Sequence, residues 1–87
     1  MKWLRLGAEQ GEDASQWLLG LSYANGEGVP QDCVQAYMWL NLAASKISLR
    51  EIRDPAVRDR DRVAALMTPE QIAEAQKLAR EWRPGSQ

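Results

Sequence analysis

An internal repeat limits what this chain can fold into more than any other feature of its sequence. Residues 3–8 (WLRLGA) return as residues 39–44 (WLNLAA), so the period is 39 minus 3, or 36 residues. Periods of about 20 to 50 residues are typical of stacked supersecondary units, none of which can bury its apolar face alone. The sequence therefore predicts a repeat architecture in which each unit depends on its neighbours.

Helix start and stop signals divide the first part of the chain. Residues 2–9 are predicted to form a helix that stops at Gly11, because Gly readily takes the left-handed conformation that closes a helix. An acid with Gln three residues later is a capping signature, and the first one begins at Asp13. It predicts a helix that continues through Tyr23. Two helices thus precede the first clear turn.

That turn lies over residues 25–31 (NGEGVPQ), where two Gly and one Pro disfavour both helix and strand. A second capping signature, Asp32 with Gln35, predicts a helix that runs to about Lys46. Apolar residues occupy nearly its whole circumference, which is typical of a helix covered on two sides in the middle of a bundle. We therefore expect a helical hairpin whose second helix is central.

The second unit of the repeat is degenerate. The period predicts a Leu-Gly pair near residues 55–56, where the chain has Pro-Ala instead. Ser48 and Pro55 are competing start signals, since Pro fits best in the first turn of a helix. We favour a helix from about Pro55 to Met67.

The last predicted helix has a start signal and an apolar stripe. Thr68, followed by Pro69 and Gln71, is a third cap with Pro at the first helical position, and the helix should end near Trp82. The stripe consists of Ile72, Ala75, Leu78, Ala79 and Trp82. No window alternates at period two for long enough to predict a strand.

The predicted fold is therefore all-α, with about five helices arranged as antiparallel hairpins stacked into an αα superhelix. Residues 1–87 should form one small helical-repeat domain. It would divide into the trailing helix of a half-repeat (2–10), one complete repeat (11–46) and a degenerate C-terminal helix pair (47–87).

Composition excludes several classes of function. A chain of 87 residues buries only about 60–65% of its unfolded surface, so good packing or a neighbour is needed. The 11 Lys and Arg against 12 Asp and Glu leave a net charge of −1, without the excess that nucleic-acid binding requires. No apolar run approaches the ~20 residues of a membrane span, and the N-terminal sequence lacks a signal-peptide pattern. We expect a cytoplasmic protein, or a periplasmic one if the sequence is truncated.

Several residues at fixed offsets resemble one full Sel-one-like repeat, a subclass of helical-hairpin solenoid related to tetratricopeptide repeats. The residues that carry the resemblance are Gly11, Leu19, Gly20, Leu21, Ser22, Tyr23, Gly26, Glu27, Gly28, Val29, Pro30, Gln31, Asp32, Ala36, Trp39, Ala43 and Ala44. The resemblance covers roughly residues 2–46 and implies a right-handed superhelix of antiparallel helix pairs. It also implies a protein-interaction module or scaffold.

The physical reading of these residues agrees with the resemblance. Gly20 inside a helix costs about 1 kcal/mol relative to Ala, which is best explained if the partner helix comes too close for a Cβ. We expect small residues of the partner helix, Ala36, Ala43 and Ala44, to lie opposite. Trp39 and Tyr23 should fill the space between the helices. Gly26 and Gly28 should take positive φ in the turn, Val29 should tuck inward, and Pro30 should stiffen the exit.

One face of the predicted helix over 13–23 is a candidate partner site. Ala14, Trp17, Leu21 and Ala24 recur at three- and four-residue steps, away from the face that carries Leu19. In tetratricopeptide-like folds such a face lines the concave groove, and Asn25 would offer a hydrogen bond near its rim. An aromatic and an aliphatic residue one turn apart are typical anchors for a partner. The alternative is that the C-terminal helices fold back over this face.

The sequence offers few of the residues that catalytic or cofactor-binding sites use. The chain has no histidine, so the usual zinc ligand and the base of a serine or cysteine triad are missing. Cys33 is the only cysteine, which excludes an internal disulfide, and we expect it to be an inert, half-buried thiol. Glu70 and Glu74 should belong to a solvated face. The alternating charges of residues 58–62 (RDRDR) should cancel rather than attract phosphate.

The leading hypothesis is a non-catalytic module that binds a protein or peptide on its concave helical face, without cofactor, nucleic acid or membrane. One alternative is a structural repeat that forms a homo-oligomer through exposed solenoid ends, either Trp3, Leu4 and Leu6 or the last helix. A third, enzymatic alternative comes from the resemblance, because some cysteine-rich relatives are linked to β-lactam binding or hydrolysis. Those relatives pair cysteines at hairpin spacing, and this chain has no second cysteine.

Overall fold

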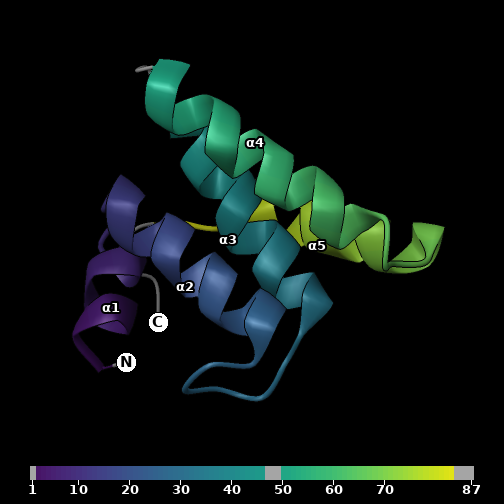
Figure 1. Cartoon of the computed structure of the whole chain (residues 1–87), viewed down its shortest axis with the longest axis horizontal. Coiled ribbons are helices and arrows are strands. Elements are labelled where there is room, and N and C mark those ends of the chain that lie inside the picture. The colour runs from purple at the N-terminus through teal and green to yellow at the C-terminus, as the bar shows by residue number, and fades with distance from the viewer. Residues whose placement is uncertain (1, 47–49, 84–87) are drawn as a thin grey trace.

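The computed structural model describes residues 2–46 and 50–83 and contains five α-helices in these ranges (Figure 1). They are α1 (Lys2–Glu9), α2 (Asp13–Asn25), α3 (Cys33–Lys46), α4 (Arg50–Ala64) and α5 (Pro69–Glu81). No strand occurs among the described residues. The predicted all-α fold of about five helices is confirmed.

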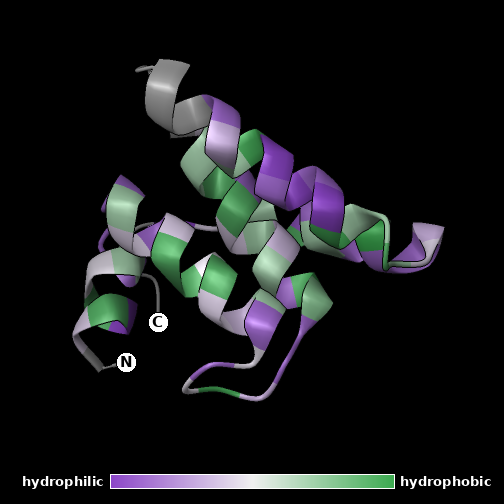
Figure 2. Cartoon of the chain, viewed as in Figure 1, coloured by the Kyte–Doolittle hydropathy of each residue, from purple (hydrophilic) through white to green (hydrophobic). Residues whose placement is uncertain are grey.

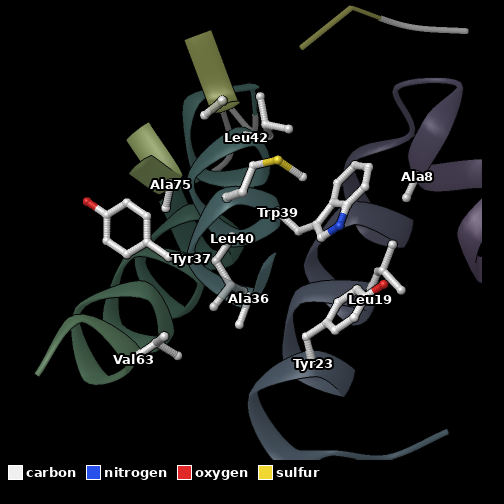
Figure 3. Close-up of a cluster of buried hydrophobic side chains, with 12 residues drawn as sticks. Ala8, Leu19, Tyr23, Ala36, Tyr37, Trp39, Leu40, Leu42, Val63 and Ala75 are labelled. Carbon is white, nitrogen blue, oxygen red and sulfur yellow. The ribbon is translucent and has the colours of Figure 1, made fainter. Parts of the chain in front are cut away.

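Helix α3 is the centre of the molecule and contacts α2, α4 and α5. Residues 36–40 and 42–44 are all buried, so both sides of the helix are covered, as its apolar circumference predicted. The hydropathy colouring shows the contrast with α4, whose outer surface is strongly polar (Figure 2). Neighbouring side chains serve different interfaces: Trp39 points toward Ala8 and Leu19, whereas Tyr37 points toward Ala75 (Figure 3).

Helices α2 and α3 form the predicted hairpin, and they come close together at Gly20. A Cβ built on Gly20 would lie 2.7 Å from Leu40 Cγ and 3.1 Å from the Leu40 backbone nitrogen. The close approach is therefore confirmed. The nearest atoms all belong to Leu40, however, and not to the three alanines that the sequence analysis placed there. Ala36, Ala43 and Ala44 are buried all the same.

The turn between these helices follows the glycine pattern. Gly26 takes φ +70° and donates its N–H to the Ser22 carbonyl, and Gly28 takes φ +77°, conformations that disfavour other residues. The Asp32 side chain accepts from the backbone N–H of Gln35 at 3.1 Å, as predicted for the cap of α3. Val29 packs against the core, also as predicted. The turn therefore fixes where α3 begins relative to the end of α2.

The start of α2 differs from the sequence prediction. Asp13 is the first helical residue, and the N-cap is Glu12, which makes no side-chain capping bond. Gln16, predicted to complete a capping box, is fully buried and donates its amide to the Ala8 carbonyl at 3.1 Å. The reason is the packing of α1 on α2, which places a carbonyl at the end of α1 within reach. Gly11, with φ +93°, follows the end of α1 as predicted.

Helix α4 also corrects the sequence analysis, because it begins at Arg50 and not at Pro55. Pro55 lies inside the helix, where it lacks the N–H that would bond the preceding turn. Ala56 and Val63, two turns apart, are both buried, and packing of this face on α3 offsets the weakness at the proline. The helix ends at Ala64, three residues before the predicted Met67. The competing start signal at Ser48 lies outside the described residues.

Helix α5 follows the prediction closely. Thr68 Oγ1 accepts from the Gln71 N–H at 3.1 Å, and the Gln71 side chain accepts from the Thr68 N–H at 2.9 Å, which completes a capping box. The predicted stripe faces the core: Ala75 and Ala79 are buried, and Ile72, Leu78 and Trp82 pack against them. The Trp82 ring meets Trp39 edge to face, with ring centroids 5.9 Å apart.

Candidate partner-binding pocket

A pocket lies where the C-terminal ends of α2 and α4 meet the start of α3. It has an empty volume of about 490 Å³, part of which is open to solvent. We refer to it as the α2–α4 pocket, and its lining residues are Leu21, Ala24, Asn25, Cys33, Asp59, Arg62, Val63 and Leu66. The turn over residues 26–32 brings Cys33 beside the end of α2, and the packing of α4 on α3 supplies the opposite wall.

The walls of this pocket are mainly apolar. Leu21 and Ala24 on α2 are partly buried and pack against the core, as does Cys33. Val63 on α4 is buried, whereas Leu66, just past the end of α4, is 72% exposed. The pocket thus offers aliphatic surface that runs from the core outward to a large exposed side chain. Sites that hold an apolar side chain of a partner have this composition.

A hydrogen-bonded group joins the two helices beside the pocket. Trp17 Nε1 on α2 donates to Asp59 Oδ2 on α4 at 3.1 Å, and Arg62 Nη2 donates to Asp59 Oδ1 at 2.7 Å. The Asp59 side chain is only 14% exposed, and Arg62 is 73% exposed. Both carboxylate oxygens of Asp59 therefore already have partners, and the indole of Trp17 is held against α4.

The five candidate residues predicted from the sequence occupy different positions. Leu21, Ala24 and Asn25 line the α2–α4 pocket. Trp17 lies next to it, is partly buried and is bonded to Asp59. Ala14 is exposed and is not a lining residue. Helix α4 therefore does pack over Trp17, which was the alternative left open by the sequence, while the other end of the same face remains open.

The residues that sequence reasoning missed all come from outside the predicted stripe. Asp59 and Arg62 were treated only as members of an alternating charged run, and Val63 and Leu66 were not considered for the site. An apolar pair three residues apart at the end of an otherwise polar helix was the available signal. Cys33 is half-buried and free, as predicted, and it contributes a small apolar surface to the pocket.

The alternating run over residues 58–62 largely satisfies its own charges. Arg62 pairs with Asp59, and Arg60 pairs with Asp61 at 3.2 Å while also donating to Asn41 on α3 at 3.1 Å. These contacts agree with the expectation that the alternating signs cancel. The predicted solvated face of α5 is likewise exposed at Glu70 and Glu74.

Tyr23, one of the residues of the repeat signature, connects α2 to α1. Its ring is buried, and its hydroxyl accepts from Arg5 Nη2 at 2.6 Å. The Arg5 guanidinium also lies over the ring, 5.9 Å from its centroid. Leu19, another apolar member of the signature on α2, is fully buried. Leu19 and Tyr23 therefore hold helices together, whereas Leu21 of the same signature lines the pocket.

Comparison with known families identifies the repeat. The model of the Sel1 repeat matches residues 1–12 and 13–47, which together span more than half of the chain. The chain belongs to the Sel1 repeat family. Sel1 repeats are helical solenoids that generally mediate protein–protein interactions and are generally not catalytic. No curated protein and no solved structure matches the chain.

The two Sel1 matches correspond to structural units. The first covers α1, and the second covers α2, the glycine turn and α3. Helices α4 and α5 lie beyond the Sel1 matches, yet each of them packs on α3. The α2–α4 pocket therefore has one wall from a matched Sel1 unit and one wall from outside it.

The described residues lack two further kinds of feature. No group of three or more His, Cys, Asp or Glu in residues 2–46 and 50–83 is arranged to hold a metal ion. None of the helices in these ranges is both long and apolar enough to cross a membrane.

Proposed function

We propose that this Sel1 repeat domain is a non-catalytic interaction module that binds a protein or peptide partner in the α2–α4 pocket. The observation that carries the proposal is the pocket itself, which three of the five candidate residues line together with Val63 and Leu66 of α4. A partner side chain placed there would be surrounded by aliphatic groups, with the exposed Asn25 amide at the edge for a backbone hydrogen bond. We expect no nucleic-acid or membrane partner.

Leu66→Ser is the most direct test, because this side chain is largely exposed and its loss should leave the helices folded. Peptides selected from a displayed random library on the intact domain should bind at least about tenfold more weakly to Leu66→Ser, as expected when a central apolar contact is removed. Circular dichroism should show unchanged helicity. Peptides that bind Leu66→Ser and the native domain equally would place the site elsewhere.

A second function, self-association, is favoured by the exposed apolar surface of α1. Trp3 is 81% exposed, whereas Trp39, its equivalent in the repeat, is 4% exposed. Leu6 is also exposed, while Leu4 packs on the core. The last helix, the other end considered, presents exposed polar residues such as Lys77 and Arg80. We propose that, if copies associate, they do so through α1.

Leu6→Ser provides the matched control for both functions. On the pocket hypothesis it should leave peptide binding intact, and on the self-association hypothesis it should dissociate any dimer seen by light scattering. Leu66→Ser should weaken peptide binding on the pocket hypothesis, and it should leave any dimer intact on the self-association hypothesis. A mass that corresponds to one chain at every concentration would reject self-association and leave the pocket hypothesis standing.

A further inference from the structure

One arginine lines the α2–α4 pocket, and a second lies on the same helix, α4. Arg62 lines the pocket and is largely exposed. Arg58, also exposed, lies one turn earlier on the same helix, and residues four apart on a helix share a face. Arg58 makes no hydrogen bond or ion pair within the described part of the chain. The lining residues include a single carboxylate, that of Asp59.

The excess positive charge of this face is that of Arg58, because the charge of Arg62 is balanced by Asp59. The two oxygens of Asp59 accept from Trp17 and Arg62, and little of the side chain is exposed. Arg62, in contrast, contributes Nη2 to Asp59, and a guanidinium carries five N–H donors in a planar fork. Arg62 can therefore bind a second carboxylate without releasing Asp59.

The helix C-termini at the pocket oppose an anion only weakly. Carbonyl groups at a helix C-terminus carry partial negative charge when they lack partners. Here Tyr23 and Ala24 accept from Asp32 N–H and Gln31 Nε2, at 3.0 and 2.9 Å. The carbonyls of Val63 and Ala64 accept from the N–H groups of Leu66 and Met67, which lie just beyond the helix. These partners reduce the repulsion that an approaching carboxylate would meet.

We propose that the ligand of the α2–α4 pocket is an acidic peptide segment that carries an aliphatic side chain. This inference rests on the proposed function and specifies its partner chemistry. The aliphatic group enters between Leu21 and Leu66, and carboxylates of the same segment bind Arg62 and Arg58. Because the chain as a whole has a net charge of −1, the attraction is local to this face and does not arise from overall charge.

Three synthetic peptides test the inference. The first has the sequence Gly-Ser-Glu-Glu-Leu-Glu-Glu-Ser-Gly, the second replaces every Glu with Lys, and the third replaces Leu with Ser. Each is titrated into the isotopically labelled domain, and affinity is taken from shifts of the Asn25 amide and Leu66 methyl resonances. The first peptide should bind at least about tenfold more tightly than either of the others, since charge and burial each contribute.

Arginine variants test whether Arg58 and Arg62 cause the preference for the acidic peptide. Arg58→Gln removes a side chain that has no partner among residues 2–46 and 50–83, and it should weaken binding of the acidic peptide by about threefold to fivefold, as expected for one exposed ion pair. The combined Arg58→Gln and Arg62→Gln variant should weaken it about tenfold or more. Arg80→Gln on α5 is the matched control, because it removes an exposed positive charge away from the pocket. Raising the salt concentration should reproduce the loss in the native domain.

Each remaining outcome rejects a defined part of the reasoning. If both leucine peptides bind equally and Leu66→Ser removes binding of both, the proposed function stands and the acidic preference is wrong. If the lysine peptide binds more tightly than the glutamate peptide, the pocket prefers positive and not negative side chains, and the proposed ligand charge is wrong. If none of the peptides shifts the pocket resonances at millimolar concentration, the inference and the pocket as a docking site both fail.

Discussion

Gly20→Ala tests the packing on which the whole hairpin depends. In an ordinary helix this substitution stabilises by about 1 kcal/mol, because Ala has the higher helix propensity. Here the new Cβ would lie 2.7 Å from Leu40 Cγ, 3.0 Å from Leu40 Cδ2 and 3.1 Å from the Leu40 nitrogen. Leu40 is fully buried, and its backbone nitrogen cannot move without separating α2 from α3. The clash must therefore displace the helices.

The expected magnitude follows from these opposing effects. Overpacking of a buried site costs about 1 to 3 kcal/mol, and more where backbone is involved, so it outweighs the gain in propensity. We expect a net loss of about 1 to 2 kcal/mol in the free energy of unfolding. For a domain of this size that corresponds to a fall in Tm of about 5 to 15 °C. Thermal and urea unfolding, followed by far-ultraviolet circular dichroism, measure both quantities.

A double-mutant cycle with Leu40→Ala measures the contact between the Cβ introduced at residue 20 and the Leu40 side chain. Leu40→Ala alone should cost about 2 to 5 kcal/mol, because it leaves a cavity. In the Gly20→Ala background it should cost about 1 to 2 kcal/mol less, since it also removes the clashing side chain. A Gly20→Ala variant that is more stable than the native domain would refute the close approach of α2 and α3.

Substitutions at three other positions have expected outcomes. Trp17→Phe should lower the free energy of unfolding by about 1 kcal/mol through the lost bond to Asp59, and Trp17→Ala by about 2 to 3 kcal/mol, both measured in urea. Unchanged stability of Trp17→Ala would show that its contact with α4 contributes nothing. Thr68→Ala should cost about 1 kcal/mol and accelerate amide exchange in the first turn of α5. Arg5→Gln should lower Tm by several degrees through its contacts with Tyr23, whereas a normal Tm would mean that they are negligible.

The parts of the fold that the sequence predicted well have local causes. The turn at Gly26, the cap at Thr68 and the central position of α3 each follow from residues close together in the chain. The start of α4 was wrong because its evidence is tertiary. Pro55 is a strong local start signal, but the packing of Ala56 and Val63 on α3 lies outside any local window. Gln16 was assigned to the wrong partner for the same reason.

Burial of repeated residues also depends on neighbours that a repeat unit does not contain. Trp3 and Trp39 occupy equivalent positions, yet only Trp39 has helices on both sides, including α5 with Trp82. Sequence alone therefore identifies which residues can form an interface, while their position in the stack decides whether it is filled. Trp17 illustrates the reverse case, since a candidate for partner contact is partly covered by α4.

The two walls of the α2–α4 pocket contribute differently to its specificity for a partner. The wall from α2 belongs to the matched repeat, and its positions are constrained because neighbouring residues such as Leu19, Gly20 and Tyr23 hold the hairpin together. The wall from α4 lies outside the match and carries every charged side chain of the pocket. The exposed Leu66 can change there with little effect on stability, because little of its side chain is buried. We therefore expect the charge preference of the pocket to be set by α4. Arg62→Glu should favour the lysine peptide over the glutamate peptide, with a loss of stability because it removes the cation beside Asp59.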